Sequence, residues 1–280
     1  MILVTGATGN VGREVVRELS GRGERFRAAY TTKEKAAEAK TANAEPVVLD
    51  FSKPETFGAA LAGVDRLFLL SANPPSESAV VHAAKAAGVR QVVKLSVFDA
   101  PAEGFVFGKM HRAVEKEIEA SGMGFTFLRP NGFMQNMANQ QAGAIQATGA
   151  FHFPAAETRI SHVDTRDIAR VAATVLTSGG HEGKAYELTG PEGLTYGQIA
   201  AEIGRAIGKP VAYVAVSDDD FRKAMAGMGA PGPFVDALSD LFRFYRTGAA
   251  SRVSHDIEKV TGRKATSFAE WARDHAASFR

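Results

Sequence analysis

The amino terminus of this chain carries the feature that most constrains its fold. A short apolar run at residues 1–5 is followed by Gly6, Gly9 and Gly12 and then by residues 13–19, which have helical periodicity. This order predicts a strand, a tight turn and a helix. Gly6 allows the turn, Gly9 lets the main chain approach a pyrophosphate, and Gly12 lets the helix pack closely on the sheet. The GxxGxxG spacing at a helix start therefore predicts a dinucleotide site rather than an incidental turn.

Apolar strand-like runs alternate with helical patterns through the first half of the chain. The expected strands are residues 26–30, 45–49, 66–70, 91–95 and 125–128, and the expected helices are residues 33–41, 54–62, 76–87 and 108–121. This alternation predicts an α/β fold with a Rossmann-type, doubly wound parallel sheet and right-handed crossovers. Ligands of such a sheet bind at the carboxyl ends of its strands, so the segments after the strands should carry the chemistry.

The second half is less regular and predicts a second lobe. A helix is expected over residues 164–176, a strand over residues 184–188, and a further helix from the Thr195 capping box to Ile207. A length of 280 residues suffices for one large α/β domain with a smaller appendage. The expected domains are residues 1–130 plus 160–190 for the dinucleotide and residues 131–159 plus 191–280 for a smaller, mostly helical substrate lobe.

Composition excludes several classes of function. The chain has no cysteine, which excludes disulfides, thiolate metal sites and cysteine nucleophiles. Its net charge of +2 is spread along the chain, so we expect no nucleic-acid partner. Ser217 and the aspartates at residues 218–220 suit a helix start, and their diverging side chains predict no metal site. Without a signal segment or an apolar run of about 18 residues, we expect a cytoplasmic monomer or homodimer without a membrane partner.

The end of the second expected strand bears on the choice of nucleotide. An acidic residue there would bind the ribose hydroxyls of NAD, but this strand ends in Tyr30, Thr31 and Thr32, with Lys33 and Lys35 close behind. Thr31, Thr32 and the two lysines, Lys35 among them, could hold a 2′-phosphate, which favours NADP(H) and leaves NAD(H) open. Alternatively, the two lysines are solvated residues of the next helix.

The segments after the other strands supply the remaining expected cofactor contacts. Asp50 and Phe51, after the third strand, are expected to border the adenine, although Asp50 could instead cap a helix. The contacts expected to phosphate, ribose and carboxamide, besides the three loop glycines, are Thr8, Asn10, Val11, Ser71, Ala72, Asn73, Ser96 and Asn131.

An apolar aromatic cavity is expected beside the nicotinamide. The residues expected to bind substrate share large, polarisable side chains and are Phe98, Phe105, Phe107, Phe133, Met134, Phe151 and Phe153. A planar aromatic guest would stack on such side chains. We expect at least three of them to line one cavity, and the alternative for each is an ordinary core position.

The helix after the fifth strand lacks a common catalytic pair. Most short-chain reductases use a Tyr-x-x-x-Lys pair there, in which the lysine lowers the pKa of the tyrosine and the tyrosine exchanges a proton with substrate. Here Phe107 and His111 hold that spacing, and phenylalanine has no proton to give. The ordinary pKa of histidine lies near neutrality, so His111 could donate a proton. Alternatively, it hydrogen-bonds the nicotinamide ribose or the backbone.

Several segments of the chain resemble a known family. They are residues 111–115, 121–122, 126–136, 160–169, 186–190 and 251–256, together with the Thr195 capping segment. Over essentially the whole chain they resemble the NmrA-like family of atypical short-chain dehydrogenase/reductases, and within it the triphenylmethane reductase and type 2 quinone oxidoreductase group. The resemblance implies NADP(H) or NAD(H), no Tyr/Lys pair and flat conjugated substrates. Thr31 stands where that group often has arginine, which weakens the preference for NADP(H).

These features predict an NAD(P)H-dependent oxidoreductase that transfers hydride to a quinone-like or conjugated aromatic acceptor. Such an acceptor spreads the developing charge over a large π-system. Catalysis then reduces mostly to holding the reacting carbons about 3–3.5 Å apart in a dry pocket. Two alternatives stay open. One is a tailoring enzyme of aromatic secondary metabolism, and the other is a non-catalytic redox sensor of the NmrA type, which would need no substrate cavity.

Overall fold

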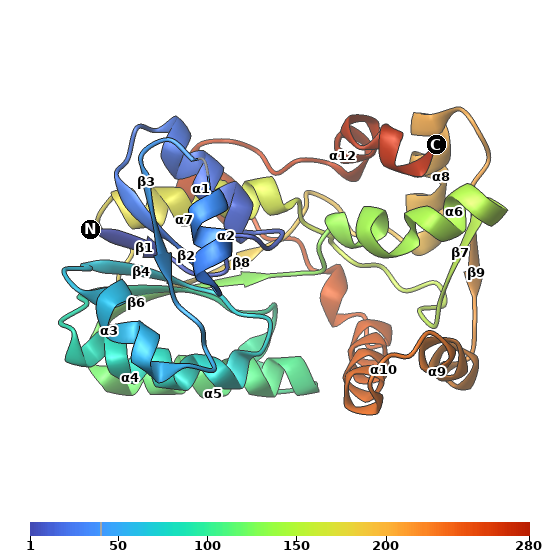
Figure 1. Ribbon diagram of the computed structural model, residues 1–280. Helices are drawn as coiled ribbons and strands as arrows, with labels where there is room; N and C mark the ends of the chain where they lie inside the picture. The colour runs from blue at the N-terminus through green and yellow to red at the C-terminus, as the bar shows by residue number, and fades with distance from the viewer. Residues whose placement is uncertain (40) are drawn as a thin grey trace.

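A seven-stranded parallel sheet forms the larger part of the molecule (Figure 1). The computed structural model describes residues 1–39 and 41–280. The strands of this sheet are β1 (Ile2–Val4), β2 (Phe26–Tyr30), β3 (Ala44–Val48), β4 (Arg66–Leu69), β5 (Gln91–Leu95), β6 (Gly124–Pro130) and β8 (Lys184–Leu188). Their order is β3-β2-β1-β4-β5-β6-β8, and every neighbouring pair is parallel. The expected doubly wound α/β fold is confirmed.

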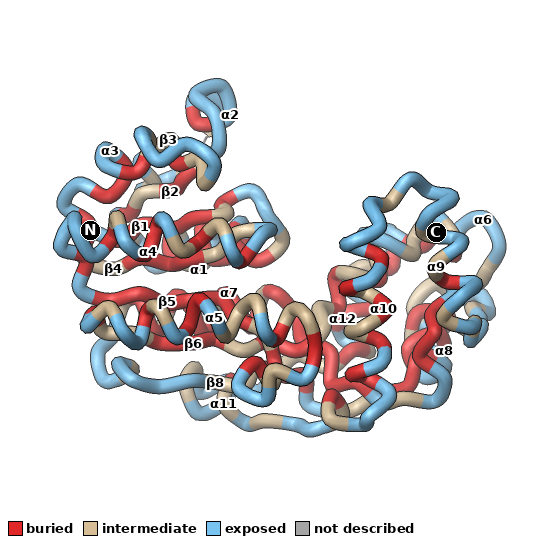
Figure 2. The backbone as a smooth tube through the Cα atoms, turned by 90° about the horizontal axis from the view of Figure 1, so that it is seen from below, coloured by how far each residue is buried: buried red, intermediate tan, exposed pale blue. Residues whose placement is uncertain are grey.

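Helices cover both faces of this sheet. One face carries α1 (Gly12–Gly21), α7 (Thr165–Thr177) and α11 (Asp256–Thr261), and the other carries α3 (Phe57–Leu61), α4 (Glu77–Ala86) and α5 (Val106–Ser121) (Figure 1). Leu19 and Val171 are buried against the first face, and Val81 and Ile118 against the second. The central strands β1, β4 and β5 are accordingly buried on both sides, as the tube in Figure 2 shows for β5, whereas the edge strands β3 and β8 are partly exposed.

The boundaries of several elements follow the sequence closely. The expected strands at residues 26–30, 91–95 and 184–188 have the bounds of β2, β5 and β8. The expected helix at residues 54–62 is divided, because a 3₁₀ turn at Pro54–Thr56 precedes α3. The expected helix at residues 33–41 includes residue 40, which lies outside the described residues; α2 (Lys33–Glu38) ends before it.

A smaller lobe lies beyond the carboxyl ends of the strands (Figure 1). Its elements are a π-helical turn (Met137–Gln141), α6 (Ala142–Thr148), β7 (Ala150–Phe153), α8 (Tyr196–Ile207), β9 (Ala212–Ala215), α9 (Asp218–Gly227), α10 (Gly232–Arg246) and α12 (Phe268–Asp274). β7 and β9 form a separate parallel pair. Phe151, Tyr196, Phe242 and Trp271 are buried in the aromatic core of this lobe.

The helix starts of the smaller lobe use the caps that the sequence predicts. Thr195 forms a capping box with Gln198 at the start of α8, which ends at Gly208 with φ 72°. The Ser217 hydroxyl accepts a hydrogen bond from the backbone N–H of Asp220 at 3.1 Å and caps α9. These bonds satisfy backbone donors that a helix start leaves free.

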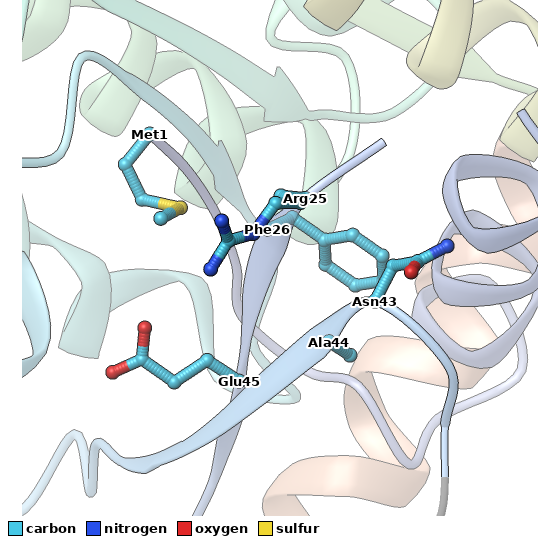
Figure 3. A pocket seen from close by; sticks show the side chains of 6 residues that line it. All are labelled: Met1, Arg25, Phe26, Asn43, Ala44 and Glu45. Carbon is cyan, nitrogen blue, oxygen red and sulfur yellow. The ribbon is translucent and has the colours of Figure 1, made fainter. Parts of the chain in front are cut away.

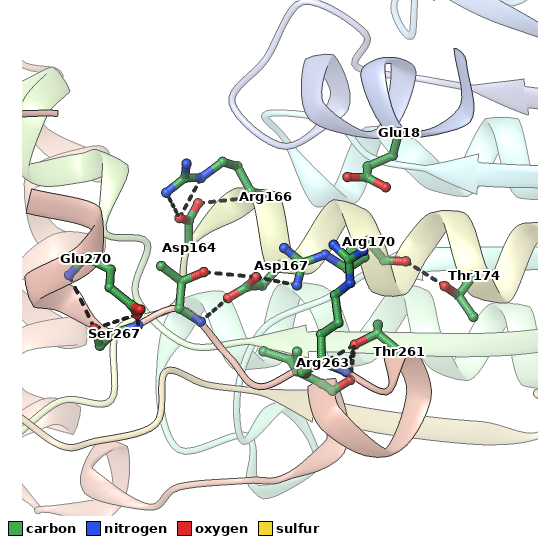
Figure 4. A network of polar contacts seen from close by, with 12 residues as sticks. Glu18, Asp164, Arg166, Asp167, Arg170, Thr174, Thr261, Arg263, Ser267 and Glu270 are labelled. Carbon is green, nitrogen blue, oxygen red and sulfur yellow. Dashed lines mark hydrogen bonds and ion pairs between the residues drawn. The ribbon is translucent and has the colours of Figure 1, made fainter. Parts of the chain in front are cut away.

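The sheet domain and the smaller lobe are joined along α7 (Figure 4). The Arg166 guanidinium pairs with Asp164 at 2.6 Å and with Asp274 of α12 at 2.8 Å. Asp167 accepts a hydrogen bond from the backbone N–H of Thr266 at 2.6 Å. The expected lobe of residues 191–280 is interrupted at α11, which packs on α7 and β8 and so lies with the sheet. No helix in the described part of the chain is long and apolar enough to cross a membrane.

Candidate active site

The three glycines after β1 differ in what a side chain would meet. Gly6 has φ 65°, and a Cβ there would lie 3.0 Å from the side chain of Leu70, at the end of β4. A Cβ on Gly12 would lie 2.0 Å from the carbonyl oxygen of Gly6, so only glycine fits where α1 packs on the loop. Gly9 is exposed, and a Cβ there would meet only that same carbonyl oxygen, at 3.4 Å. The open side of the loop is therefore at Gly9.

The start of α1 offers free donors on that open side. The backbone N–H groups of Asn10, Val11 and Gly12 meet no hydrogen-bond acceptor within the described ranges, and Val11 gives no side-chain cap. The loop lies where the strand order reverses, between β1 and β4, which is where doubly wound sheets bind ligands. Free N–H groups at a helix start suit an anion, so these residues fit a dinucleotide pyrophosphate.

The residues expected around the adenosine end lie at the surface. Thr31 and Lys35 are exposed, and the neighbouring Thr32 caps α2 by accepting from the backbone N–H of Lys35 at 3.3 Å. The Asp50 carboxylate accepts from the backbone N–H and hydroxyl of Ser52, which lowers the pKa of Asp50. Asp50 thus caps the turn after β3 and not a helix, since the following 3₁₀ turn has Lys53 at its N-cap, and Phe51 beside it is half-buried.

The segment after β4 is held by a buried carboxylate. Both the backbone N–H and the hydroxyl of Ser71 donate to Oε1 of Glu77, at 2.9 and 3.0 Å. Ala72 and Asn73, the next two residues, are exposed. The segment therefore has a fixed base and an open edge beside the glycine loop.

A cavity of about 250 Å³ opens at the carboxyl ends of β4, β5 and β6. Four of the expected substrate residues line it: Phe98, Phe105, Phe107 and Phe133. Helix α10 closes the other side with Leu241, Phe244 and Tyr245. Phe105 and Phe244 stack across this boundary with ring centroids 4.3 Å apart. The walls are thus mostly aromatic and come from both the sheet domain and the smaller lobe.

Three of the expected substrate residues do not line this cavity. Met134, Phe151 and Phe153 are buried in the core of the smaller lobe. Phe151 and Phe153 belong to β7, whose pairing with β9 turns their rings onto Tyr196. The expectation that they face a guest does not match the structure, because a short strand pairing takes them into the core.

Asn131 lines the cavity, but its side-chain amide is engaged in hydrogen bonds within the protein. Its amide nitrogen donates to Ser161 Oγ at 2.9 Å and to the carbonyl oxygen of Ala250 at 2.8 Å. Its amide oxygen accepts from the backbone N–H of Gly132 at 2.9 Å. The side-chain N–H groups of Asn131 are therefore engaged and tie β6 to the segments at Ser161 and Ala250; a cofactor contact of this residue stays a prediction.

His111 lies at the cavity on α5, in contact with a buried lysine. Its Nδ1 is 3.2 Å from Nζ of Lys94. Burial, together with the Lys94 charge, lowers the pKa of His111 well below its usual value. At neutral pH the imidazole is therefore uncharged. The expectation of a proton donor with an ordinary pKa near neutrality does not match this setting.

Behind His111 lies a charged pair that was not predicted from the sequence. Lys94 and Glu77 have no exposed side-chain surface, and Lys94 Nζ lies 2.5 Å from Glu77 Oε2. The available signal was a lysine inside the apolar run of β5, where both faces of the sheet are covered. Ser96, the residue after β5, is buried at the same cavity.

Another hollow lies at the opposite end of the sheet (Figure 3). It has a volume of about 240 Å³ and is lined by Met1, Arg25, Phe26, Asn43, Ala44 and Glu45. Met1, Phe26 and Ala44 lie at the amino ends of β1, β2 and β3. This end of a parallel sheet is not where its ligands bind, so the hollow is not part of the candidate site.

Comparison with known proteins over the full length of the chain identifies its family. The profile of the NmrA-like family matches residues 1–274. The chain belongs to the NmrA-like family. It is 38% identical over 284 residues to the NAD(P)H azoreductase of Xenophilus azovorans, a match that covers 100% of this chain and 99% of the relative. It is 31% identical over 278 residues to quinone oxidoreductase 2 of Escherichia coli, with 96% of each chain covered.

Solved structures of similar proteins agree with the fold. The NADPH complex of the Escherichia coli quinone oxidoreductase QOR2 superimposes with a TM-score of 0.88 at 31% identity, covering 98% of this chain and 99% of that one. The NADP(H) complex of the Citrobacter triphenylmethane reductase superimposes with a TM-score of 0.87 at 28% identity, covering 99% of this chain and 100% of that one. Both likenesses extend over the sheet domain and the smaller lobe.

Proposed function

We propose that this protein reduces quinones, and other flat conjugated acceptors such as azo compounds and cationic dyes, with NADPH. The observation that carries the proposal is the aromatic cavity, which opens at the carboxyl ends of the strands beside the glycine loop. A redox sensor would need the loop but not the cavity.

The coarser activity follows from the family and its enzymes. Relatives similar over the full length include an NAD(P)H azoreductase and a quinone oxidoreductase, and similar solved structures hold NADPH or NADP(H). Together they make this chain an NAD(P)H-dependent oxidoreductase that uses NADP(H). The class of acceptor rests on the residues of the cavity.

Different residues of the site have different roles in the proposed reaction. When bound, the reduced nicotinamide supplies a hydride. The N–H groups of Asn10, Val11 and Gly12 bind the pyrophosphate and so fix the position of the cofactor. Phe98, Phe107 and other ring faces of the cavity orient a planar acceptor and exclude water.

The residues at the usual Tyr and Lys positions suit such an acceptor. Phe107 and His111 stand there, and His111 is uncharged at neutral pH. A quinone or azo compound carries the incoming electrons on a conjugated system and takes its remaining proton from water, so no phenol is needed at Phe107. A simple aliphatic ketone lacks this delocalisation and is expected to be a poor substrate.

The proposal is tested by following NADPH oxidation with a naphthoquinone, an azo dye, a triphenylmethane dye and an aliphatic ketone. Turnover is expected with the conjugated acceptors and not with the ketone. A matched control is Phe107→Tyr, which keeps the aromatic ring and adds a phenolic hydroxyl at the cavity. Micromolar NADPH binding without turnover of any acceptor would instead support the sensor, and preference for the ketone would overturn the proposed acceptor class.

A further inference from the structure

Behind His111, the sheet buries a complete ion pair. Lys94 is on β5 and Glu77 is on α4, and neither side chain has exposed surface. Lys94 Nζ lies 2.5 Å from Glu77 Oε2, 2.8 Å from the carbonyl oxygen of Leu95 and 3.2 Å from Nδ1 of His111. Two N–H groups of the ammonium therefore have hydrogen-bond acceptors, in Leu95 and His111, while the contact with Glu77 Oε2 is an ion pair without hydrogen-bond geometry. Burying two charges costs free energy, so a stable fold needs contacts such as these.

The contact with Lys94 determines where the proton of His111 resides. An ammonium group has three donors and no acceptor, so Nδ1 of the neutral imidazole must accept. The remaining ring proton is then on Nε2. Nδ1 faces the interior of the sheet domain and His111 also lines the cavity, so Nε2 lies on the cavity side of the ring.

We propose that Lys94 and Glu77 are positioning residues for the reduction, which hold His111 as a neutral imidazole with its Nε2–H directed at the acceptor. This inference rests on the proposed function for the identity of the acceptor. The arrangement of Glu77, Lys94 and His111 does not depend on the proposed function.

Other charged groups near α5 have partners of their own. Glu115 binds Arg129 at 2.8 Å and Arg112 at 3.0 Å, and Asp240 of α10 accepts from the backbone N–H of Val106 at 2.7 Å. Lys94 and Glu77 are thus the charged groups that face His111 from the sheet and α4, and Lys94 is the one in contact. A cation in contact opposes protonation of the imidazole.

A neutral Nε2–H donor matches the charge that develops on a quinone or azo acceptor. After hydride arrives, negative charge collects on an oxygen or nitrogen, and a hydrogen bond from His111 stabilises it. The proton that completes the reduction comes from water, so His111 donates a hydrogen bond and keeps its proton. Because the imidazole is neutral, it does not repel a cationic dye. Because hydride addition neutralises that dye at carbon, its reduction gains nothing from the Nε2–H.

The first test reads the imidazole directly, in the full chain without cofactor. In ¹⁵N-labelled protein, the His111 signal, assigned by its loss in His111→Gln, should show a bare Nδ1 and a protonated Nε2 between pH 5.5 and pH 8. In the double variant Lys94→Met with Glu77→Gln, the single tautomer should be lost and the pKa of His111 should rise. The double variant leaves no buried charge, and glutamine keeps the oxygen that binds Ser71, so it should fold. A protonated Nδ1, or titration of wild-type His111 near its ordinary pKa, would overturn the proposal.

The second test compares two acceptors. His111→Leu should lower kcat for a naphthoquinone about a hundredfold, as expected for loss of a donor to a developing anion. His111→Gln, which can accept from Lys94 and donate to the acceptor, should recover most of the kcat that His111→Leu loses. In His111→Leu, kcat for a triphenylmethane cation should fall by a much smaller factor than kcat for the naphthoquinone. Equal losses for both acceptors would contradict the role of Nε2–H. Absence of turnover in the wild type would refute the proposed function alone, because the tautomer measurement stands apart from it.

Discussion

At the scale of the residue, two glycines of the loop are needed for different reasons. Gly9 leaves room for a ligand, and Gly12 lets the helix pack on the loop. Gly9 and Gly12 are part of one motif, yet a Cβ would touch the carbonyl oxygen of Gly6 at 3.4 Å at Gly9 and would clash with that oxygen at 2.0 Å at Gly12. Sequence spacing cannot make this distinction, because both positions match the same pattern. Substitutions at the two glycines should therefore fail in different ways.

Gly9→Val is expected to fold with a Tm close to wild type and to bind NADPH roughly a hundredfold more weakly, because the side chain occupies the pyrophosphate position. Gly12→Ala, the matched control, should lose about 3 kcal/mol of stability because the helix start must move. Fluorescence titration and thermal unfolding measure the two effects. Wild-type affinity in Gly9→Val would place the nucleotide elsewhere.

A second residue-scale prediction concerns pH. Burial lowers the pKa of His162 to about 4, whereas an unfolded histidine titrates near 6.5. As pH falls below about 6.5, His162 becomes protonated in the unfolded chain but stays neutral in the folded chain. The free energy of unfolding therefore falls by about 1.4 kcal/mol per pH unit until the folded pKa is reached.

Replacing His162 with glutamine should therefore make stability less dependent on pH. Between pH 7 and pH 5 the wild type should lose about 2 kcal/mol more than His162→Gln in urea unfolding. His152→Gln, an exposed substitution on β7, is the control. Parallel losses in wild type and His162→Gln would show that His162 is protonated in the fold.

At the scale of the element, α5 is held in place by buried charge as well as by apolar packing. Glu115 has no exposed side-chain surface and binds Arg129 of β6 through two hydrogen bonds, at 3.0 and 2.8 Å. Although burial raises the pKa of Glu115, its hydrogen bonds to Arg129 leave that pKa below the usual value. These contacts help fix the helix that carries Phe107 and His111.

Glu115→Gln should therefore destabilise the protein by about 3 kcal/mol, because the buried side of Arg129 loses its countercharge. Lys116→Ala, one residue along the same helix, breaks an exposed pair with Glu103 and should leave stability nearly unchanged. Urea unfolding of the two variants makes the comparison. Similar midpoints for both would mean that the Glu115 contacts do not anchor α5.

Local signals explain which elements could be predicted from the sequence. Caps at Thr195 and Ser217 start α8 and α9 because their chemistry is contained within one helical turn. The pairing of β7 with β9 could not be predicted, because it joins residues 150–153 to residues 212–215 and leaves no local pattern. The aromatic residues of β7 were accordingly expected at the cavity, although they belong to the core.

At the scale of the whole molecule, the candidate site is shared between two lobes. The sheet domain supplies Phe98, Phe133 and His111, and α10 of the smaller lobe supplies Phe244 and Tyr245. The glycine loop and the aromatic residues of the sheet domain could be predicted, because each follows a strand. The α10 wall and the Lys94–Glu77 pair could not, since both depend on packing between segments far apart in the sequence.

The central claim is that the glycine loop and the aromatic cavity form one site. A crystal structure of the complex with NADP⁺ tests it most directly. We expect the pyrophosphate against the N–H groups of residues 10–12 and the nicotinamide at the mouth of the cavity, beside His111. A nicotinamide directed away from the cavity, or a nucleotide bound anywhere else, would contradict it.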